Sequence, residues 1–241
     1  MIPRLFKPLP LTEGATILLE EKERHYLIRV MRLTVGQSVI LFNGRGEQWQ
    51  ARIDHAGPPL RLVLETALPV VRESPLAITL VQGLAKGPAL EWVIQKGVEL
   101  GMAAMIPLIC ERGRHDDGNP QRWGRIAAEA AEQCGRSLVP PIHPPTRWQN
   151  LADLLPDGPR LIFWEEEGGK SSLPSLLRTL EPPATITLIV GPEGGFSSQE
   201  VMTACQHLGC QKVGLGPRIL RTETAAITAL AALQLYWGDL A

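Results

Sequence analysis

The fold of this chain is decided by residues 185–208, which read TITLIVGPEGGFSSQEVMTACQHL. Residues 185–190 are almost uniformly apolar, as in a strand that is buried on both faces. A glycine-rich turn follows, and Ser197 and Glu200 have the spacing of a capping box that begins a helix, where Phe196 can form a hydrophobic staple with Val201. The segment therefore predicts a buried strand that leads directly into a helix. In open α/β sheets, ligands bind beyond strand ends of this kind.

The same alternation of strands and helices extends over the chain from residue 75 onward. The expected strands are 77–81, 104–109, 161–164 and 212–214, and the expected helices are 89–100, 121–136, 173–180, 197–208 and 222–237. Strands that are apolar on both faces and alternate with helices predict an α/β layer with a mostly parallel sheet.

Residues 15–70 have a different, β-rich pattern. Short strands are expected at 15–20, 37–42, 48–53 and 60–64, with hairpin turn residues at 43–46. A charged helix is expected at 21–32, with Leu27, Val30 and Met31 on one face. Short strands around one helix suggest a small barrel. A proline-bounded seam at 69–75 divides the chain, and we expect domains at 1–72 and 73–241.

Composition limits the classes of protein that fit. Of 241 residues, 44% are hydrophobic and 20% are charged, as in a globular protein. The net charge is −1, with ten basic and eight acidic residues up to residue 74, so no strong basic footprint for nucleic acid is present. No apolar run could span a membrane and the N-terminal segment is not a secretory signal, which predicts a cytoplasmic protein. The four cysteines lack metal-ligand spacing, so reduced thiols and no metal site are expected.

Three segments contain candidate functional residues. The loop 191–195 has a carboxylate, Glu193, and no lysine, which disfavours a phosphate and suits a ligand with hydroxyls, an adenine edge or a positive centre. An ordinary strand-to-helix turn is the alternative.

The second segment, LGPRILRTET at 215–224, also leads from a strand to a helix. Thr222 is expected as the N-cap, and Glu223 suits the first turn of the helix. The helix is apolar nearly all round, which predicts burial against another element such as a second subunit. Arg218 and Arg221 could contact an anionic substrate, or form surface ion pairs.

The third segment, EAAEQCGR at 129–136, is compatible with a simple i,i+4 pair between Glu132 and Arg136. The chain has no early G-x-G-x-x-G and no G-x-S-x-G, so neither a dinucleotide site nor a serine nucleophile turn is indicated.

These segments, together with HYLIRVMR at 25–32 and KGVELG at 96–101, resemble the bacterial 16S ribosomal RNA (uracil-N3)-methyltransferases of the SPOUT class. The resemblance extends over nearly the whole chain, and GPEGGF at 191–196 followed by LGPRILRTETA at 215–225 is its most specific part. Val98, Gly113 and Cys134 depart from the family pattern at positions outside the glycine loops.

The resemblance implies a PUA-like β-barrel followed by a trefoil-knotted α/β domain that dimerises. It implies an S-adenosylmethionine pocket that includes Trp164, Gly191, Glu193, Gly194, Gly195, Leu215, Gly216, Ile219 and Leu220. It also implies a substrate in 16S ribosomal RNA of the small subunit, which Arg24, Arg29, Arg32 and Arg45 would contact.

For the chemistry, we expect Arg221 or Arg136 to stabilise the developing uracil anion. No general base is assigned, because Glu132, Glu223 and bulk water all remain candidates. Two other functions stay open: a different SPOUT reaction, such as ribose 2′-O-methylation, and a catalytically silent ribosome-assembly factor.

Overall fold

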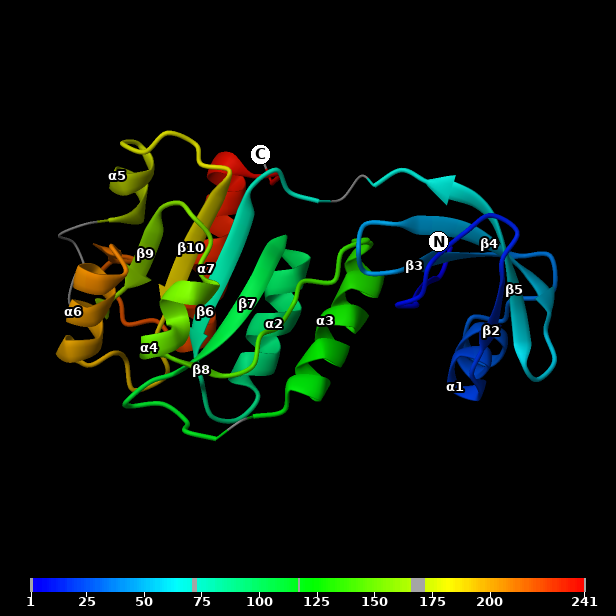
Figure 1. The fold of residues 1–241 in the computed structure, drawn as a ribbon, viewed down its shortest axis with the longest axis horizontal. Coiled ribbons are helices and arrows are strands. Elements are labelled where there is room, and N and C mark those ends of the chain that lie inside the picture. The colour runs from blue at the N-terminus through cyan, green and yellow to red at the C-terminus, as the bar shows by residue number, and fades with distance from the viewer. Residues whose placement is uncertain (1, 71–72, 117, 166–171, 241) are drawn as a thin grey trace. The chain divides into compact units, whose positions relative to one another are not determined.

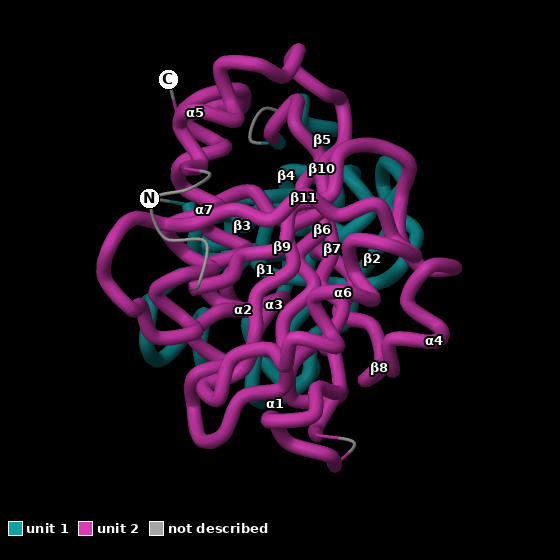
Figure 2. The backbone as a smooth tube through the Cα atoms, turned by 90° about the vertical axis from the view of Figure 1, so that its left-hand side faces the viewer, with its two compact units in different colours: residues 1–73, 131–139 teal, residues 74–130, 140–241 magenta. Residues whose placement is uncertain are grey.

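The structure, a computed structural model, describes residues 2–70, 73–116, 118–165 and 172–240. The chain forms two compact units, which Figure 2 shows in separate colours. The smaller unit contains Met1–Glu73 and Ala131–Val139, and the larger contains Ser74–Ala130 and Pro140–Ala241. Residues 131–139, at the end of a helix of the larger unit, thus cluster with the smaller one.

The smaller unit is built on a five-stranded sheet in the order β1-β3-β4-β5-β2. The strands are β1 Arg4–Phe6, β2 Thr16–Leu19, β3 Ser38–Phe42, β4 Gln48–His55 and β5 Leu60–Leu68. β1 pairs with β3 in parallel, and the other pairs are antiparallel. Register shifts between β4 and β5 allow the sheet to curl around a core that includes Leu41, Ile53 and Leu62 (Figure 1).

The expected helix at 21–32 is only partly regular. α1 spans Glu21–Arg24, and the chain then continues as a π-helix over His25–Val30. Leu27 is buried as expected, but Val30 and Met31 are exposed, so the prediction of a common apolar face was wrong. The physical reason is the wider turn, in which the Met31 amide donates to the Tyr26 carbonyl at 2.9 Å and the side chains no longer recur every 3.6 residues.

The larger unit contains a six-stranded sheet in the order β11-β9-β10-β6-β7-β8. Its strands are β6 Ala77–Gly83, β7 Met102–Ile109, β8 Thr146–Arg147, β9 Arg160–Phe163, β10 Thr185–Val190 and β11 Gln211–Val213. Every strand pair of this sheet in the described ranges is parallel, which confirms the parallel sheet that the sequence predicts.

Helices cover both faces of this sheet (Figure 1). α2 (Ala89–Glu99) and α7 (Thr222–Trp237) pack on each other and against the strands. α4 (Trp148–Leu151) and α6 (Ser198–His207) contribute to the core on the opposite face, with Val81, Ile162 and Ile189 beneath them. The remaining elements are α3 Pro120–Cys134, the 3-10 helix Ala152–Leu154 and α5 Leu173–Leu177. Among the described residues, none of the helices combines the length and the hydrophobicity needed to cross a membrane.

Candidate active site

A cavity of about 870 Å³ lies at the carboxyl ends of three neighbouring strands of the larger unit. Phe163, Val190 and Val213, the last residues of β9, β10 and β11, all line it. The rest of the lining comes from residues 86–92, from Trp164 and Glu165 after β9, and from the two segments that the sequence singles out, 190–196 and 213–227. The fold therefore brings both glycine-containing loops to one cavity, at the sheet edge where ligands of α/β proteins bind.

The first loop turns tightly as it leaves β10. The Gly195 amide donates to the Pro192 carbonyl at 2.9 Å, and Gly195 has a φ of +67°, a conformation that disfavours side chains. A Cβ atom at Gly195 would lie 2.6 Å from Oε1 of Glu165. Glu193 accepts a hydrogen bond of 2.5 Å from the Lys86 amide, which joins this loop to the segment after β6.

The end of this loop is fixed by the predicted capping box. Ser197 is the N-cap of α6: its side chain accepts from the Glu200 amide at 3.3 Å, while Glu200 accepts from the Ser197 amide at 2.8 Å. The buried Glu200 carboxylate also accepts from the Glu111 amide at 2.9 Å and from Nε1 of Trp148 at 3.0 Å. Glu200 thus joins α6 to two other segments beside the site.

The second loop, which contributes residues 213–227 to the cavity, is largely exposed to solvent over residues 216–219. Gly216 has a φ of +93°, and Ile219 is 88% exposed although it lines the cavity. Arg218 and Arg221 are exposed and also line the cavity. The wall of the cavity formed by this loop is therefore open to solvent.

The expected N-cap of α7 was wrong. Arg221 occupies the N-cap position without a side-chain cap bond, and Thr222 is the first residue of the helix. The buried Thr222 hydroxyl instead donates to the Gly191 carbonyl at 2.5 Å and accepts from Nε2 of Gln82 at 2.8 Å. The Thr222 hydroxyl therefore bonds residues that are distant in the sequence and does not cap the helix, and local spacing cannot reveal such partners.

Most of the predicted cofactor-binding residues line the cavity. They are Trp164, Gly191, Glu193, Gly195, Leu215, Gly216, Ile219 and Leu220. Gly194 does not line it, and a Cβ atom there would lie 2.8 Å from Cβ of Arg112. Gly194 is therefore placed where it permits close packing of the loop on the neighbouring segment.

The two candidate catalytic arginines are not brought together within the larger unit. Arg221 lines the cavity, whereas Arg136 is buried in the smaller unit and its Nε and Nη2 donate to Glu73 at 2.9 and 2.8 Å. Glu73 also accepts from the amides of Ser137 and Leu138. This network gives Arg136 a structural partner, and its catalytic role stays a prediction.

The two carboxylates considered as bases belong to different units. Glu223 lines the cavity, while Glu132 accepts a hydrogen bond of 2.7 Å from the Phe6 amide in the smaller unit.

Burial raises the pKa of the Cys110 thiol, and it raises the pKa of Cys210 to about 12. These two thiols stay protonated at neutral pH, so neither is a nucleophile.

The four arginines expected to contact RNA all belong to the smaller unit. Arg29, Arg32 and Arg45 are exposed, and Arg32 has a φ of 57° directly after the π-helix. Arg24 forms an ion pair with Glu21 at 2.6 Å, and this hydrogen bond lowers the pKa of the Glu21 carboxyl.

Sequence reasoning missed several residues of the site. Lys86 and Trp92 line the cavity but belong to no motif. Gln82 and Gly83 end β6 beside the first loop, and a Cβ atom at Gly83 would lie 2.5 Å from the Pro192 nitrogen. The available signal was the change from an apolar run to a polar residue and a glycine at the end of the strand.

Comparisons with known proteins identify the family of the chain. The RNA methyltransferase domain family matches residues 72–234, and the RNA methyltransferase PUA domain family matches residues 19–61. The ribosomal RNA small subunit methyltransferase E of Bacillus subtilis is 34% identical, with 94% of each chain covered. The chain belongs to the ribosomal RNA small subunit methyltransferase E family.

Two solved structures are similar to this chain over its full length, which supports its membership of the methyltransferase E family. The methyltransferase E of Neisseria gonorrhoeae, bound to S-adenosyl methionine, has a TM-score of 0.90 and 34% identity, with 100% of both chains covered. A methyltransferase of Legionella pneumophila in complex with the same cofactor has a TM-score of 0.89 and 34% identity over 100% of both chains. The expected fold class, a PUA-like domain followed by an α/β SPOUT methyltransferase domain, is confirmed.

Proposed function

We propose that this protein transfers a methyl group from S-adenosylmethionine to N3 of a uracil in 16S ribosomal RNA, in the cytoplasm and on the small ribosomal subunit. The observation that carries this proposal is the cavity that the loops 190–196 and 213–227 form at the carboxyl ends of β9, β10 and β11. Relatives with this fold over their full length are bound to the same cofactor.

The cavity suits this cofactor in size and in chemistry. Its volume of about 870 Å³ is within the range of small-molecule sites. Phe163, Val190 and Leu220 provide apolar walls, and glycine-rich backbone provides amide and carbonyl groups without side-chain obstruction. The carboxylates of Glu165 and Glu193 also line it and suit hydroxyls and positive charge. When bound, S-adenosylmethionine supplies an electrophilic methyl group on its sulfonium.

Arg221 is the residue we assign to the acceptor. The imide N3–H of uracil must lose its proton as the nitrogen becomes a nucleophile, so negative charge develops on the ring. A guanidinium that is already in place at the cavity stabilises this charge without reorganisation. Arg221 is exposed at the cavity wall and directly precedes α7. Of the two candidate bases, Glu132 and Glu223, Glu223 lines this cavity, and we assign to it the role of accepting the proton.

Replacing Arg221 by alanine is expected to lower kcat by about 10²- to 10³-fold, the usual effect of removing one group that stabilises transition-state charge. The affinity for S-adenosylmethionine should change little, because the assigned role concerns the uracil. Arg218→Ala, which removes the same charge from the same loop, is the matched comparison and should cost less. Equal losses of kcat in both variants would mean that loop charge alone matters, and the assignment of Arg221 would be wrong.

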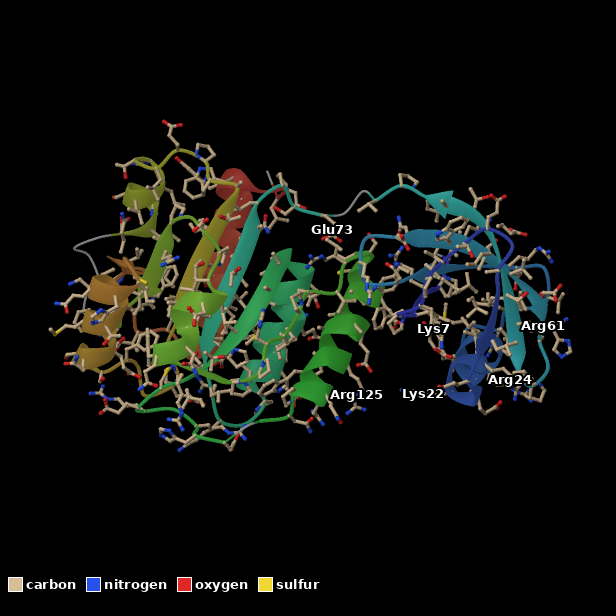
Figure 3. All side chains as sticks on the ribbon, in the orientation of Figure 1. Lys7, Lys22, Arg24, Arg61, Glu73 and Arg125 are labelled. Atoms are coloured by element: carbon tan, nitrogen blue, oxygen red, sulfur yellow. The ribbon has the colours of Figure 1, made fainter. Side chains whose placement is uncertain are left out.

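The smaller unit is proposed to bind the RNA through Arg24, Arg29, Arg32 and Arg45. Lys22 and Arg24 project from α1 in Figure 3, and the chain up to residue 74 carries a net charge of only +2. So small a charge predicts weak, salt-sensitive binding to free RNA. A folded ribosomal particle, which presents several surfaces at once, is therefore the better substrate.

The decisive experiment incubates the protein and isotope-labelled S-adenosylmethionine with small subunits that lack this modification, and with free 16S RNA. Mass spectrometry of nucleosides should find N3-methyluridine formed on the particle and much less on the free RNA. A ribose 2′-O-methyl product would instead indicate a different SPOUT reaction. Failure to bind the cofactor would favour a silent assembly factor. A variant with Arg29, Arg32 and Arg45 replaced by glutamine tests the RNA surface in the same assay.

We also propose that the protein is a homodimer. α7 is apolar nearly all round, and it leaves Leu235 and Tyr236 exposed, while Trp92 on the neighbouring α2 is exposed at the cavity. Exposed apolar side chains on adjoining helices are typical of a surface that another subunit covers.

A further inference from the structure

Gln82 is a polar residue in the interior of the larger unit, beside the cavity but outside its lining. It is the penultimate residue of β6, is 0% exposed, and lies opposite Val190 in the pairing of β6 with β10. Its Nε2 lies 3.2 Å from the Gly83 carbonyl, 3.3 Å from the Gly191 carbonyl and 2.8 Å from Oγ1 of Thr222. A single amide nitrogen therefore reaches the end of β6, the first cofactor loop and the first residue of α7.

The direction of these hydrogen bonds is fixed by chemistry. Two of the three neighbours are carbonyl oxygens, so the amide must present its N–H₂ and not its oxygen. Because Thr222 accepts from Gln82, its own proton is directed to the Gly191 carbonyl, at 2.5 Å. The Gly191 carbonyl thus receives two donors, and the arrangement admits one orientation of each side chain.

The other half of the amide makes no such contribution. Oε1 of Gln82 is buried and has no hydrogen-bond partner among the residues that the structure describes. An unsatisfied buried oxygen opposes folding, and an apolar residue at this strand position would avoid that cost. The donor half of the side chain is therefore what this position requires.

We infer that Gln82 and Thr222 act as a positioning pair that fixes the two cofactor loops relative to one another; this inference rests on the proposed function. Gly191 begins the loop 191–195, and Thr222 directly follows Arg221. Because both side chains donate to the Gly191 carbonyl, loss of either contact would loosen the position of Gly191 relative to Arg221, the residue that we propose faces the acceptor. Gly83 completes the arrangement, because a side chain there would collide with Pro192.

The first test compares two substitutions of Thr222. Thr222→Val keeps the branched shape but removes the hydroxyl, whereas Thr222→Ser keeps the hydroxyl. Calorimetry should find the Kd for S-adenosylmethionine raised about tenfold or more in the valine variant, as expected when buried hydrogen bonds are lost. The serine variant should stay within about threefold of the unchanged protein. Equal affinities in the two variants, whether high or low, would overturn the inference.

A second test uses the charge of a carboxyl group at Gln82. In Gln82→Glu, an ionised carboxylate would face two carbonyl oxygens, while the protonated acid can donate to one of them. Cofactor affinity of this variant should therefore fall as the pH rises through the pKa of the buried acid. Gln82→Met, which cannot ionise, should be weak at every pH. The same pH dependence in Gln82→Glu and Gln82→Met would contradict a directional role for the amide.

A measurement without cofactor separates this inference from the proposed function. Hydrogen exchange of the free protein should show faster exchange of amides at 191–195 in Thr222→Val than in Thr222→Ser. If the unchanged protein fails to bind S-adenosylmethionine, the proposed function is wrong, yet this difference in exchange still decides whether the pair positions the loop. Equal exchange in the two variants would overturn the pair.

Discussion

Gly195 and Gly209 have almost the same backbone conformation, with φ values of +67° and +65°, but different surroundings. A Cβ atom at Gly195 would lie 2.6 Å from Glu165, whereas nothing lies within 4 Å of one at Gly209. Both positions penalise a side chain through the backbone, and only Gly195 also lines the cavity. The comparison separates the cost of backbone strain from the loss of space for a ligand.

Gly195→Val is expected to abolish binding of S-adenosylmethionine while the protein stays folded. Gly209→Val should lose about 1–2 kcal/mol of stability from the left-handed conformation alone and should bind the cofactor normally. Calorimetry gives the two affinities, and urea denaturation gives the two free energies of unfolding. Unchanged affinity in Gly195→Val would remove this loop from the cofactor site.

Single residues were predictable when their partners were near in sequence. Ser197 and Glu200 form the expected capping box because three residues of separation suffice to define it. Thr222 was misassigned because its partners, Gly191 and Gln82, lie 31 and 140 residues away. The place of Arg136 beside Glu73, 63 residues away, was inaccessible for the same reason.

At the scale of elements, the segment that follows α3 is held within the smaller unit by hydrogen bonds. Glu73 accepts from Arg136, Ser137 and Leu138, and Nη2 of Arg4 donates to the Arg136 carbonyl at 2.9 Å. Residues 131–139 therefore belong to the smaller unit through specific hydrogen bonds as well as through proximity.

Arg136→Ala should lower the free energy of unfolding by about 3 kcal/mol, because it leaves the largely buried Glu73 carboxylate without its cation. Glu73→Gln, which retains an acceptor for the backbone amides, should cost less. Urea denaturation measures both variants, and turnover is measured under conditions in which each is folded. Unchanged stability combined with a large loss of kcat would instead support the catalytic role that the sequence suggests for Arg136.

Regular elements followed the sequence well, and short or irregular ones did not. In the larger sheet, β6, β7, β9 and β10 were located because their runs of apolar residues are long enough to identify. β1 has three residues and β8 has two, which is too short for any periodicity to appear. The π-helix at His25–Val30 escaped prediction because its residues fit an ordinary amphipathic helix.

At the scale of the whole molecule, the alternation of strands and helices predicted a parallel sheet but not the order β11-β9-β10-β6-β7-β8. Strand order depends on contacts between distant segments, and local periodicity carries no information on them. The knot was implied by the resemblance alone, since knotted chains are rare exceptions among folds.

The proposed dimer predicts a mass in solution of twice the 26.4 kDa of one chain, as measured by light scattering during gel filtration. Leu235→Asp should shift the protein toward the monomer, because it places a charge on the apolar surface of α7. Met202→Asp is the control: Met202 is 49% exposed on α6, compared with 61% for Leu235 on α7. A monomer at micromolar concentration, or equal effects of the two changes, would contradict a dimer through α7.

The segments that complete the cavity come late in the chain. β11 joins the sheet at β9, and the wall formed by residues 213–227 follows it. During synthesis, β6, β9 and β10 can pair before that wall has left the exit tunnel of the translating ribosome. We therefore expect the cofactor not to assist the folding of the nascent polypeptide before residues 213–227 have emerged, because the cavity lacks one wall until then.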